Sequence, residues 1–157
     1  MNYSTLAFFF VIFTCAYCRH IGEILCRQCG EFITRQSELI NATGVNESFL
    51  KYKYDFPLVG KNTTVHVLKN PAGQSFHVFG AKTAHLKFHG PAQSDATWFP
   101  GMHWTICVCK ACGKHMGWYF QPELSSKRSD KRESFVGIVL DNVISSDYTD
   151  GLVKTPL

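Results

Sequence analysis

The sequence predicts one all-β domain whose two ends are held together by a structural zinc ion. Three observations predict this fold class. Aromatic residues make up 14% of the 157 residues, short segments of strand-like alternation recur with turn signals about every 8–12 residues, and two Cys-x-x-Cys pairs lie far apart in the chain. Apolar residues reach 45% and charged residues 18%, which is typical of a globular fold and excludes general disorder.

The alternation of apolar and polar residues predicts the strands in order. In the segment 49–59, Tyr52, Tyr54 and Phe56 alternate with charged residues, which indicates a half-buried strand. Segment 31–46 is mixed and fits a short strand or helix. A turn is expected at 70–73 and a loop at 90–95, where Gly and Pro interrupt the pattern. Strands are expected at 49–59, 63–68, 76–79, 85–88, 97–99, 104–108, 117–120 and 135–140.

The N-terminus predicts a secreted protein. Residues 6–13 form an uncharged apolar run, small residues follow it, and charge begins at Arg19. A core of about 8–12 residues is too short to cross a bilayer of about 30 Å and is typical of a signal peptide, here residues 1–18. A buried N-terminal strand and a short anchor are the alternatives. We expect a mature domain at 21–145 and a tail at 146–157 that lacks a lipid-anchor signal, giving an extracellular protein with no membrane attachment.

Three Asn-x-Ser/Thr sequons support that compartment. One such pattern occurs easily by chance, but three within 24 residues of a chain with a signal peptide indicate a glycosylated surface. The expected glycosylation sites are Asn41, Asn46 and Asn62.

Two cysteine pairs predict the zinc site. Each pair has two intervening residues and is followed by a glycine, which permits the sharp backbone bend of a zinc knuckle. Two knuckles supply four thiolates to one ion, with no coordination position left open for catalysis. We expect one structural zinc, and its ligands are Cys26, Cys29, Cys109 and Cys112.

Disulfide bonds are the alternative reading of these cysteines, because secreted proteins favour them. The chain has seven cysteines, of which Cys15 and Cys18 lie in the predicted signal peptide. The remaining five are an odd number, which favours zinc. The fifth, Cys107, is two residues before Cys109 on an expected strand. Both side chains then share a face, and we expect Cys107 to be a buried, neutral thiol.

The tryptophans predict a ligand site. All three lie within 21 residues: Trp98 and Trp104 flank a Pro-Gly turn, and Trp118 follows the second knuckle. On a strand, Trp118 and Phe120 point to one face and Tyr119 to the other. Aromatic walls on a rigid frame suit a flat, weakly polar ligand. Burial of the tryptophans as ordinary core residues is an equally good reading of the pattern alone.

A resemblance separates these two readings. It rests on four motifs: Ala96-Thr97-Trp98-Phe99-Pro100-Gly101, Trp104-Thr105, Cys109-Lys110-Ala111-Cys112 and His115-Met116-Gly117-Trp118-Tyr119-Phe120. In order and spacing, these motifs resemble the thalidomide-binding domain of the cereblon family, also called the CULT domain. The likeness extends over about residues 21–145, with Asn70-Pro71 resembling the ligand-side turn and Cys26/Cys29 the first zinc pair.

The resemblance implies two antiparallel sheets pinned at one end by zinc, a fold called a β-tent. It also implies a pocket that receives a cyclic imide or uracil-like ring, with the backbone of residues 96–98 pairing with the imide. A member of this family has His where this chain has Ala96. The ligand residues that the resemblance implies are Asn70, Pro71, Ala96, Trp98, Trp104, Trp118 and Phe120. The upstream region of full-length cereblon has no counterpart, so we expect no ubiquitin-ligase partner.

Three other functions compete with this one. An enzyme related to B-type methionine-sulfoxide reductases would use Cys107 as nucleophile, whereas a glycan- or protein-binding module would use the tryptophans as a stacking surface. A cation cage would need a carboxylate, and Asp95 is the nearest. The net charge of +4 is scattered, and the basic cluster at 127–132 is interrupted, so we expect no nucleic-acid binding. We expect a binding module and not an enzyme.

Overall fold

The computed structural model describes residues 22–123 and 133–148. Within these two ranges the chain forms eleven β-strands and two short 3-10 helices. The elements are β1 (Glu23–Cys26), β2 (Phe32–Arg35), η1 (Gln36–Glu38), β3 (Leu39–Ile40), β4 (Leu50–Leu58), β5 (Lys61–Lys69), β6 (Ser75–Ala81), β7 (Leu86–Gln93), β8 (Met102–Cys109), β9 (His115–Pro122), β10 (Phe135–Val139), η2 (Leu140–Asn142) and β11 (Val143–Ser145).

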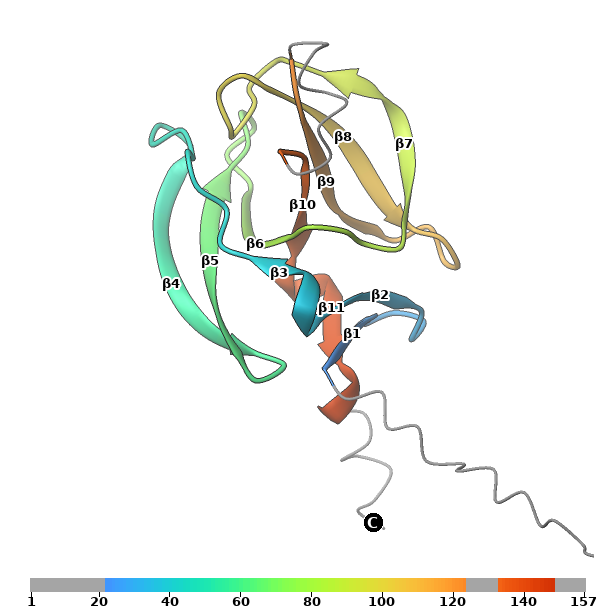
Figure 1. Cartoon of the computed structure of the whole chain (residues 1–157). Coiled ribbons are helices and arrows are strands. Elements are labelled where there is room, and N and C mark those ends of the chain that lie inside the picture. The colour runs from blue at the N-terminus through green and yellow to red at the C-terminus, as the bar shows by residue number, and fades with distance from the viewer. Residues whose placement is uncertain (1–21, 124–132, 149–157) are drawn as a thin grey trace, which may run out of the picture.

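The strands form two antiparallel sheets, which confirms the predicted fold class. The small sheet has the order β11-β1-β2 and lies at one end of the molecule (Figure 1). The large sheet has the order β4-β5-β6-β10-β9-β8-β7, with β3 paired to β6. Residues far apart in sequence are therefore neighbours in the large sheet, since β10 lies between β6 and β9.

Two expected segments differ in the structure. Thr97–Phe99 was expected as a strand but lies in a loop between β7 and β8, because Ala96 has a left-handed backbone (φ 50°) that interrupts extended geometry. Conversely, Gly90-Pro91 was expected to open a loop but lies inside β7, whose pairing with β8 is irregular between His89 and Gln93. The irregularity accommodates the proline, which has no N–H to donate.

The half-buried character expected for β4 holds only in part. Tyr54 is partly buried and its hydroxyl lies 2.8 Å from Nδ1 of His77. Tyr52 and Phe56, on the same face, are 52% and 38% exposed. Among the described strands, β4 is an edge strand of the large sheet, so none of them lies beyond it to help cover these two rings.

The buried apolar residues form two clusters. The first lies beside the cysteines and includes Ile24, Ile33, Phe79 and Ile138. The second lies further along the large sheet and contains Leu68, Val78, Trp98, Phe99, Phe120 and Phe135. At Gly117 the strands β9 and β10 approach so closely that a Cβ atom would overlap the carbonyl oxygen of Gly137. Glycine is therefore required there, next to Trp118.

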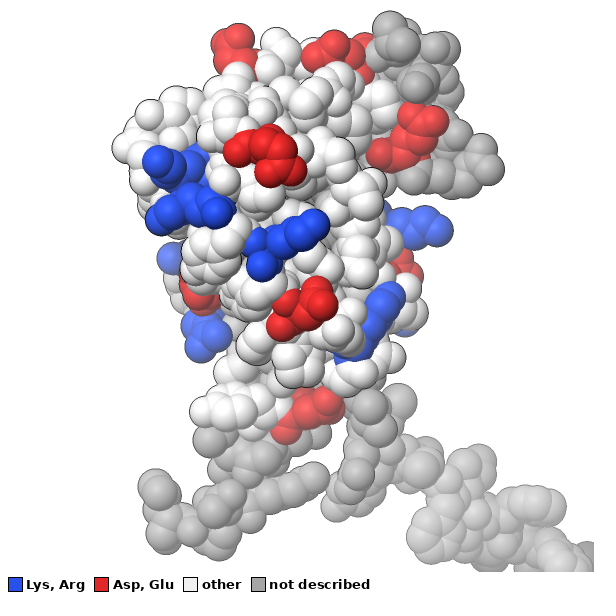
Figure 2. Space-filling view, turned by 90° about the vertical axis from the view of Figure 1, so that its left-hand side faces the viewer, with Lys and Arg blue, Asp and Glu red and all other residues white. Residues whose placement is uncertain are grey.

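Both basic and acidic side chains lie on the face over β4 and β5 (Figure 2). Among the described residues, no helix is both long and apolar enough to cross a bilayer. The predicted signal peptide at 1–18 and most of the predicted tail at 146–157 lie outside the described residues. The proposed domain limits therefore stay predictions.

Candidate functional site

The two Cys-x-x-Cys turns have the same backbone structure. In each, the N–H of the first cysteine donates to the carbonyl five residues on, at 2.8 Å, and the glycine N–H four residues on donates back to the cysteine carbonyl, at 2.9 and 3.0 Å. The two glycines, Gly30 and Gly113, have φ of 76° and 72°, a region that other residues enter at a cost. Each sequence pair is thus a preformed turn that directs two thiols to one side.

The structure brings the four predicted ligand cysteines together. Their sulfur atoms all lie within 4.8 Å of one another. Sulfur pairs from opposite knuckles lie 3.7 Å apart (Cys26 and Cys112) and 3.6 Å apart (Cys29 and Cys109). A tetrahedral zinc with Zn–S bonds of about 2.3 Å requires sulfurs about 3.8 Å apart, whereas a disulfide requires about 2.05 Å. The geometry fits a four-cysteine zinc site and does not fit disulfide bonds.

The position of this site explains what an ion would do there. Cys26 ends β1 of the small sheet and Cys109 ends β8 of the large sheet, so one ion would link the two sheets. Four sulfur ligands would leave no position for a substrate, which is typical of structural zinc sites.

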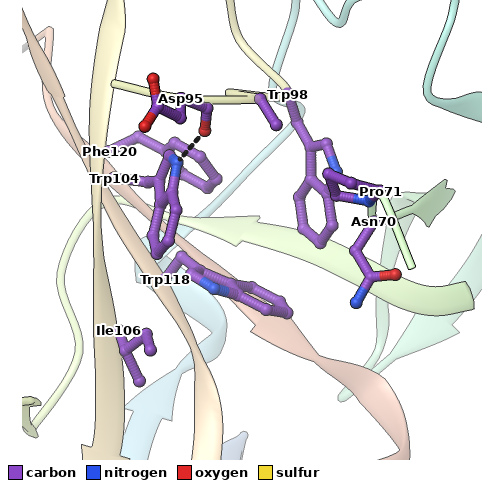
Figure 3. A pocket seen from close by; sticks show the side chains of 9 residues that line it. Asn70, Pro71, Asp95, Trp98, Trp104, Ile106, Trp118 and Phe120 are labelled. Carbon is purple, nitrogen blue, oxygen red and sulfur yellow. Dashed lines mark hydrogen bonds between the residues drawn. The ribbon is translucent and has the colours of Figure 1, made fainter. Parts of the chain in front are cut away.

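The aromatic residues of β8 and β9 share one sheet face because of the pairing register. Trp104 lies opposite Phe120, and Ile106 lies opposite Trp118. Directly opposed residues in an antiparallel pair project from the same face. The loop after β7 brings Trp98 to this group (Figure 3). The result is a cavity of about 340 Å³ lined by Asn70, Pro71, Asp95, Ala96, Trp98, Trp104, Ile106, Trp118 and Phe120.

All seven residues expected at the ligand site line this cavity, which we call the cage. Two further lining residues, Asp95 and Ile106, were not among them. Ile106 could have been found by alternation, since it lies two residues after Trp104 on one strand. Asp95 was considered only as a partner for a cation, and Figure 3 shows its carboxylate turned away from the space between the indoles. Tyr119 faces the other side of the sheet, where its ring lies 5.2 Å from that of Phe88.

Each indole of the cage is held in a fixed orientation. The Nε1–H of Trp98 donates to the Lys69 carbonyl at 2.9 Å, and that of Trp104 donates to the Asp95 carbonyl at 2.8 Å. The Trp118 ring packs edge-to-face against Trp98, with centroids 4.6 Å apart, and against Phe76, at 5.1 Å. The two hydrogen bonds use the in-plane N–H groups of Trp98 and Trp104 and therefore fix these rings from their edges.

The cage has a buried floor and partly open walls. Phe120 is 1% exposed and Trp98 6% exposed, and the Phe120 ring packs against Phe99 at 4.7 Å and Phe135 at 5.1 Å. Trp104 and Trp118 remain partly exposed. Trp98 is thus as buried as a core residue, whereas Trp104 and Trp118 pack against the same cluster with part of each side chain exposed.

The loop beside the cage offers unused backbone groups. In residues 22–123 and 133–148, the carbonyl of Ala96 and the N–H of Trp98 have no hydrogen-bond partner, whereas the Trp98 carbonyl accepts from the Asn46 N–H at 2.8 Å. Beside Trp98, the Asn70 side-chain oxygen accepts from the Gln74 N–H at 2.9 Å and so fixes the turn between β5 and β6 (Figure 3). One donor and one acceptor, two residues apart, are thus available beside an apolar cavity.

Cys107 lies on the opposite face of β8 from the cage. It is 1% exposed, and burial raises the pKa of its thiol to about 12. Its sulfur lies 3.7 Å from the Thr105 carbonyl. The predicted state, a buried and neutral thiol, agrees with this environment, since a nucleophilic cysteine needs a lowered pKa and access to substrate.

Comparison with known proteins supports the likeness drawn from the motifs. No model of a known protein family matches the chain. Curated proteins named cereblon do match. The chain is 37% identical to the Gallus gallus protein over 57 residues, which is 36% of this chain and 12% of that protein. It is 46% identical to the Xenopus tropicalis protein over 39 residues (25% and 9%) and 26% identical to the Drosophila mojavensis protein over 117 residues (69% and 14%).

The fold and the sites define an all-β domain of two antiparallel sheets with a four-cysteine cluster that could hold one zinc ion. Together with the matches to cereblon, they identify the chain as a cereblon-like domain of the CULT type. The chain matches less than a fifth of the length of the relatives named above.

Proposed function

We propose that this protein is a secreted binding module that holds a cyclic imide or uracil-like ring in the cage. The observation that carries the proposal is the pairing of an aromatic cavity with two unused backbone groups, the Ala96 carbonyl and the Trp98 N–H. The cavity volume of about 340 Å³ lies at the small end of the range for small-molecule sites, which suits a single ring.

The chemistry of an imide matches these groups. An imide presents an N–H between two carbonyls, so it donates one hydrogen bond and accepts others along one edge. The Ala96 carbonyl can accept from the imide N–H, and the Trp98 N–H can donate to an imide carbonyl. Neither contact uses a side chain, so Ala96, in place of the His of that family member, removes no backbone partner. We expect weak binding, with a Kd of about micromolar, or about −8 kcal/mol.

A titration of the mature domain, followed by tryptophan fluorescence, tests this function. The probes are glutarimide, uracil and tetramethylammonium. We expect the first two to bind and the third not to bind, because the Asp95 carboxylate is turned away from the cage. A cation held by ring faces would gain only about 0.5–2 kcal/mol per good contact. Tighter binding of tetramethylammonium than of either ring would contradict the proposal.

We also propose that the four cysteines hold one structural zinc and that the protein has no enzymatic activity. The close fit of the sulfur positions to zinc distances supports the first part. The burial and raised pKa of Cys107 argue against a reductase that would use it as nucleophile. A turnover assay with a methionine-sulfoxide substrate is expected to give no product. Binding of the ring is itself the proposed activity.

Secretion and glycosylation complete the proposal. Asn41 and Asn62 are exposed, and Asn46 is partly buried, so the side chains of the first two are open to an attached glycan. Expression in a secretory host is expected to yield protein in the medium that begins between about residues 17 and 20 and loses mass with an endoglycosidase. Recovery of full-length, unglycosylated protein from the cytosol would contradict this part without bearing on the cage.

A further inference from the structure

A second hollow adjoins the cage on the same face of the large sheet. Its volume is about 730 Å³, and Ile106 and Trp118 line both it and the cage. Its other wall comes from β7, where Lys87 lies opposite Val108 and His89 lies opposite Ile106. Opposed residues share a face, so these β7 side chains project from the same face as the indoles of Trp104 and Trp118. The hollow therefore continues the cage along the sheet.

The hollow is basic, and we call it the basic groove, defined by Lys87, His89, Lys110 and His115 with the shared Ile106 and Trp118. Among its described lining residues none bears a carboxylate. Burial lowers the pKa of His115, so this imidazole is neutral at pH 7. The ammonium groups of Lys87 and Lys110, both exposed, carry the positive charge of the groove at pH 7. This differs from the face over β4 and β5, where both acidic and basic side chains occur (Figure 2).

The relative positions of the cage loop and the groove give the direction in which a ligand would extend. Asp95 and Trp98 lie at one end of the cage, and Ile106 lies at the other (Figure 3). A ring whose imide edge pairs with the loop must direct its remaining edge elsewhere. Ile106 and Trp118 form the wall between cage and groove, so a substituent that leaves the ring past them enters the groove.

We propose that the ring held in the cage carries an anionic group, and that Lys87 and Lys110 bind this group in the basic groove. This inference rests on the proposed function, because the ring must occupy the cage. The class of ligand that combines both features is a uracil nucleotide. Its base has an imide edge, and its sugar phosphate leaves the base from a different ring atom. Lysine ammonium groups bind phosphate as point charges, and such exposed pairs are weakened by salt.

The test compares uridine with uridine 5′-monophosphate by titration of the mature domain. At low ionic strength we expect the monophosphate to bind about tenfold more tightly than uridine, and at about 1 M salt, where the Debye length falls to about 3 Å, we expect the two affinities to converge. Equal affinity at low salt would overturn the inference while leaving the cage function intact. Failure of both ligands to bind would overturn the proposed function and the inference with it.

Charge-reversal variants locate the phosphate. Lys87→Glu/Lys110→Glu is expected to remove the tenfold preference and to leave uridine affinity unchanged. Because Lys110 lies between two zinc ligands, Lys87→Glu alone provides a second variant outside the knuckle, and it is expected to reduce the preference at least threefold. The matched control is Lys51→Glu/Lys53→Glu on β4, which changes net charge by the same amount. A loss of preference as large in this control as in the groove variant would contradict the assignment.

Discussion

The knuckle end and the cage end of this domain are constructed in different ways. The four cysteines come from two short turns with the same hydrogen bonds, and each turn follows from the spacing of two cysteines and a glycine. The cage is assembled from a turn, a loop and two strands, and it depends on the register of β8 against β9. Each half of the metal site therefore forms from a local turn, whereas the cage forms only when distant segments pack together. Strand β8 connects them, with Cys109 on one face and Trp104 on the other.

This comparison predicts that loss of a knuckle cysteine also prevents the cage from forming. Cys109→Ser is expected to remove zinc and to unfold or aggregate the protein, with loss of ring binding. Structural zinc contributes about 10 kcal/mol or more in small zinc-finger domains, and this domain, with its two buried clusters, should lose less. Elemental analysis and thermal unfolding measure the two effects.

The control for this change is Cys107→Ser, two residues away on the same strand face. It is expected to keep one zinc per chain and to cost only about 1–3 kcal/mol for a buried hydroxyl without a full set of partners. A protein that contains no zinc in its unmodified form, with no free thiols except that of Cys107, would instead indicate disulfide bonds.

A substitution in the wall of the cage, by contrast, should not unfold the protein. Trp104 is partly exposed, and Trp104→Ala is expected to weaken ring binding by more than about 2 kcal/mol with a smaller loss of stability. Phe120 is the buried floor, and Phe120→Ala is expected to cost about 3–5 kcal/mol of stability in addition to binding. Chemical unfolding and ligand titration of both variants separate the two roles. If Trp104→Ala destabilises the protein as much as Phe120→Ala, Trp104 is a core residue and not a ligand wall.

A smaller effect is expected from His66, which is buried on β5 away from both sites. Burial lowers its pKa, and the Lys53 charge opposite it lowers the pKa further. The unfolded chain, with a histidine pKa of about 6.5, therefore takes up the proton more readily than the folded protein. Stability should fall as pH drops below about 6.5, by at most about 1.4 kcal/mol per pH unit for one group.

Zinc thiolates also lose stability in acid, so a variant is needed to assign this slope. In His66→Gln, thermal unfolding between about pH 7.5 and 6 is expected to depend less on pH than in the unmodified protein. Identical pH dependence in the two proteins would show that His66 contributes nothing to it.

Local sequence patterns predicted all of the knuckle site but only part of the cage. The knuckle spacing alone indicated the four-cysteine site, because a Cys-x-x-Cys-Gly turn needs no distant partner to form. Alternation alone placed Trp118 and Phe120 on one face and Tyr119 on the other. The gathering of Trp98 with them, and the part played by Asn70 and Pro71, came from the resemblance, since no local pattern relates the turn at residue 70 to β8.

What the sequence did not predict has physical causes. The loop at 97–99 has apolar residues typical of a strand, but the left-handed Ala96 and the bond from Asn46 to Trp98 hold it out of the sheet. The exposed rings on β4 follow from its place at the sheet edge. The basic groove has Lys87 from β7 and Lys110 from the second knuckle in its lining. These residues lie near one another only because β7 pairs with β8, and local sequence patterns do not predict that pairing.

The most direct test of the cage is a calorimetric titration of the mature domain with glutarimide and with N-methylglutarimide. The two rings differ by one methyl group on the atom expected to donate to the Ala96 carbonyl. Methylation deletes that donor and adds volume in a cavity of about 340 Å³. We predict binding of glutarimide with a Kd of about micromolar and no detectable binding of the N-methyl form. Equal affinity for the two rings would contradict the assignment of the cage.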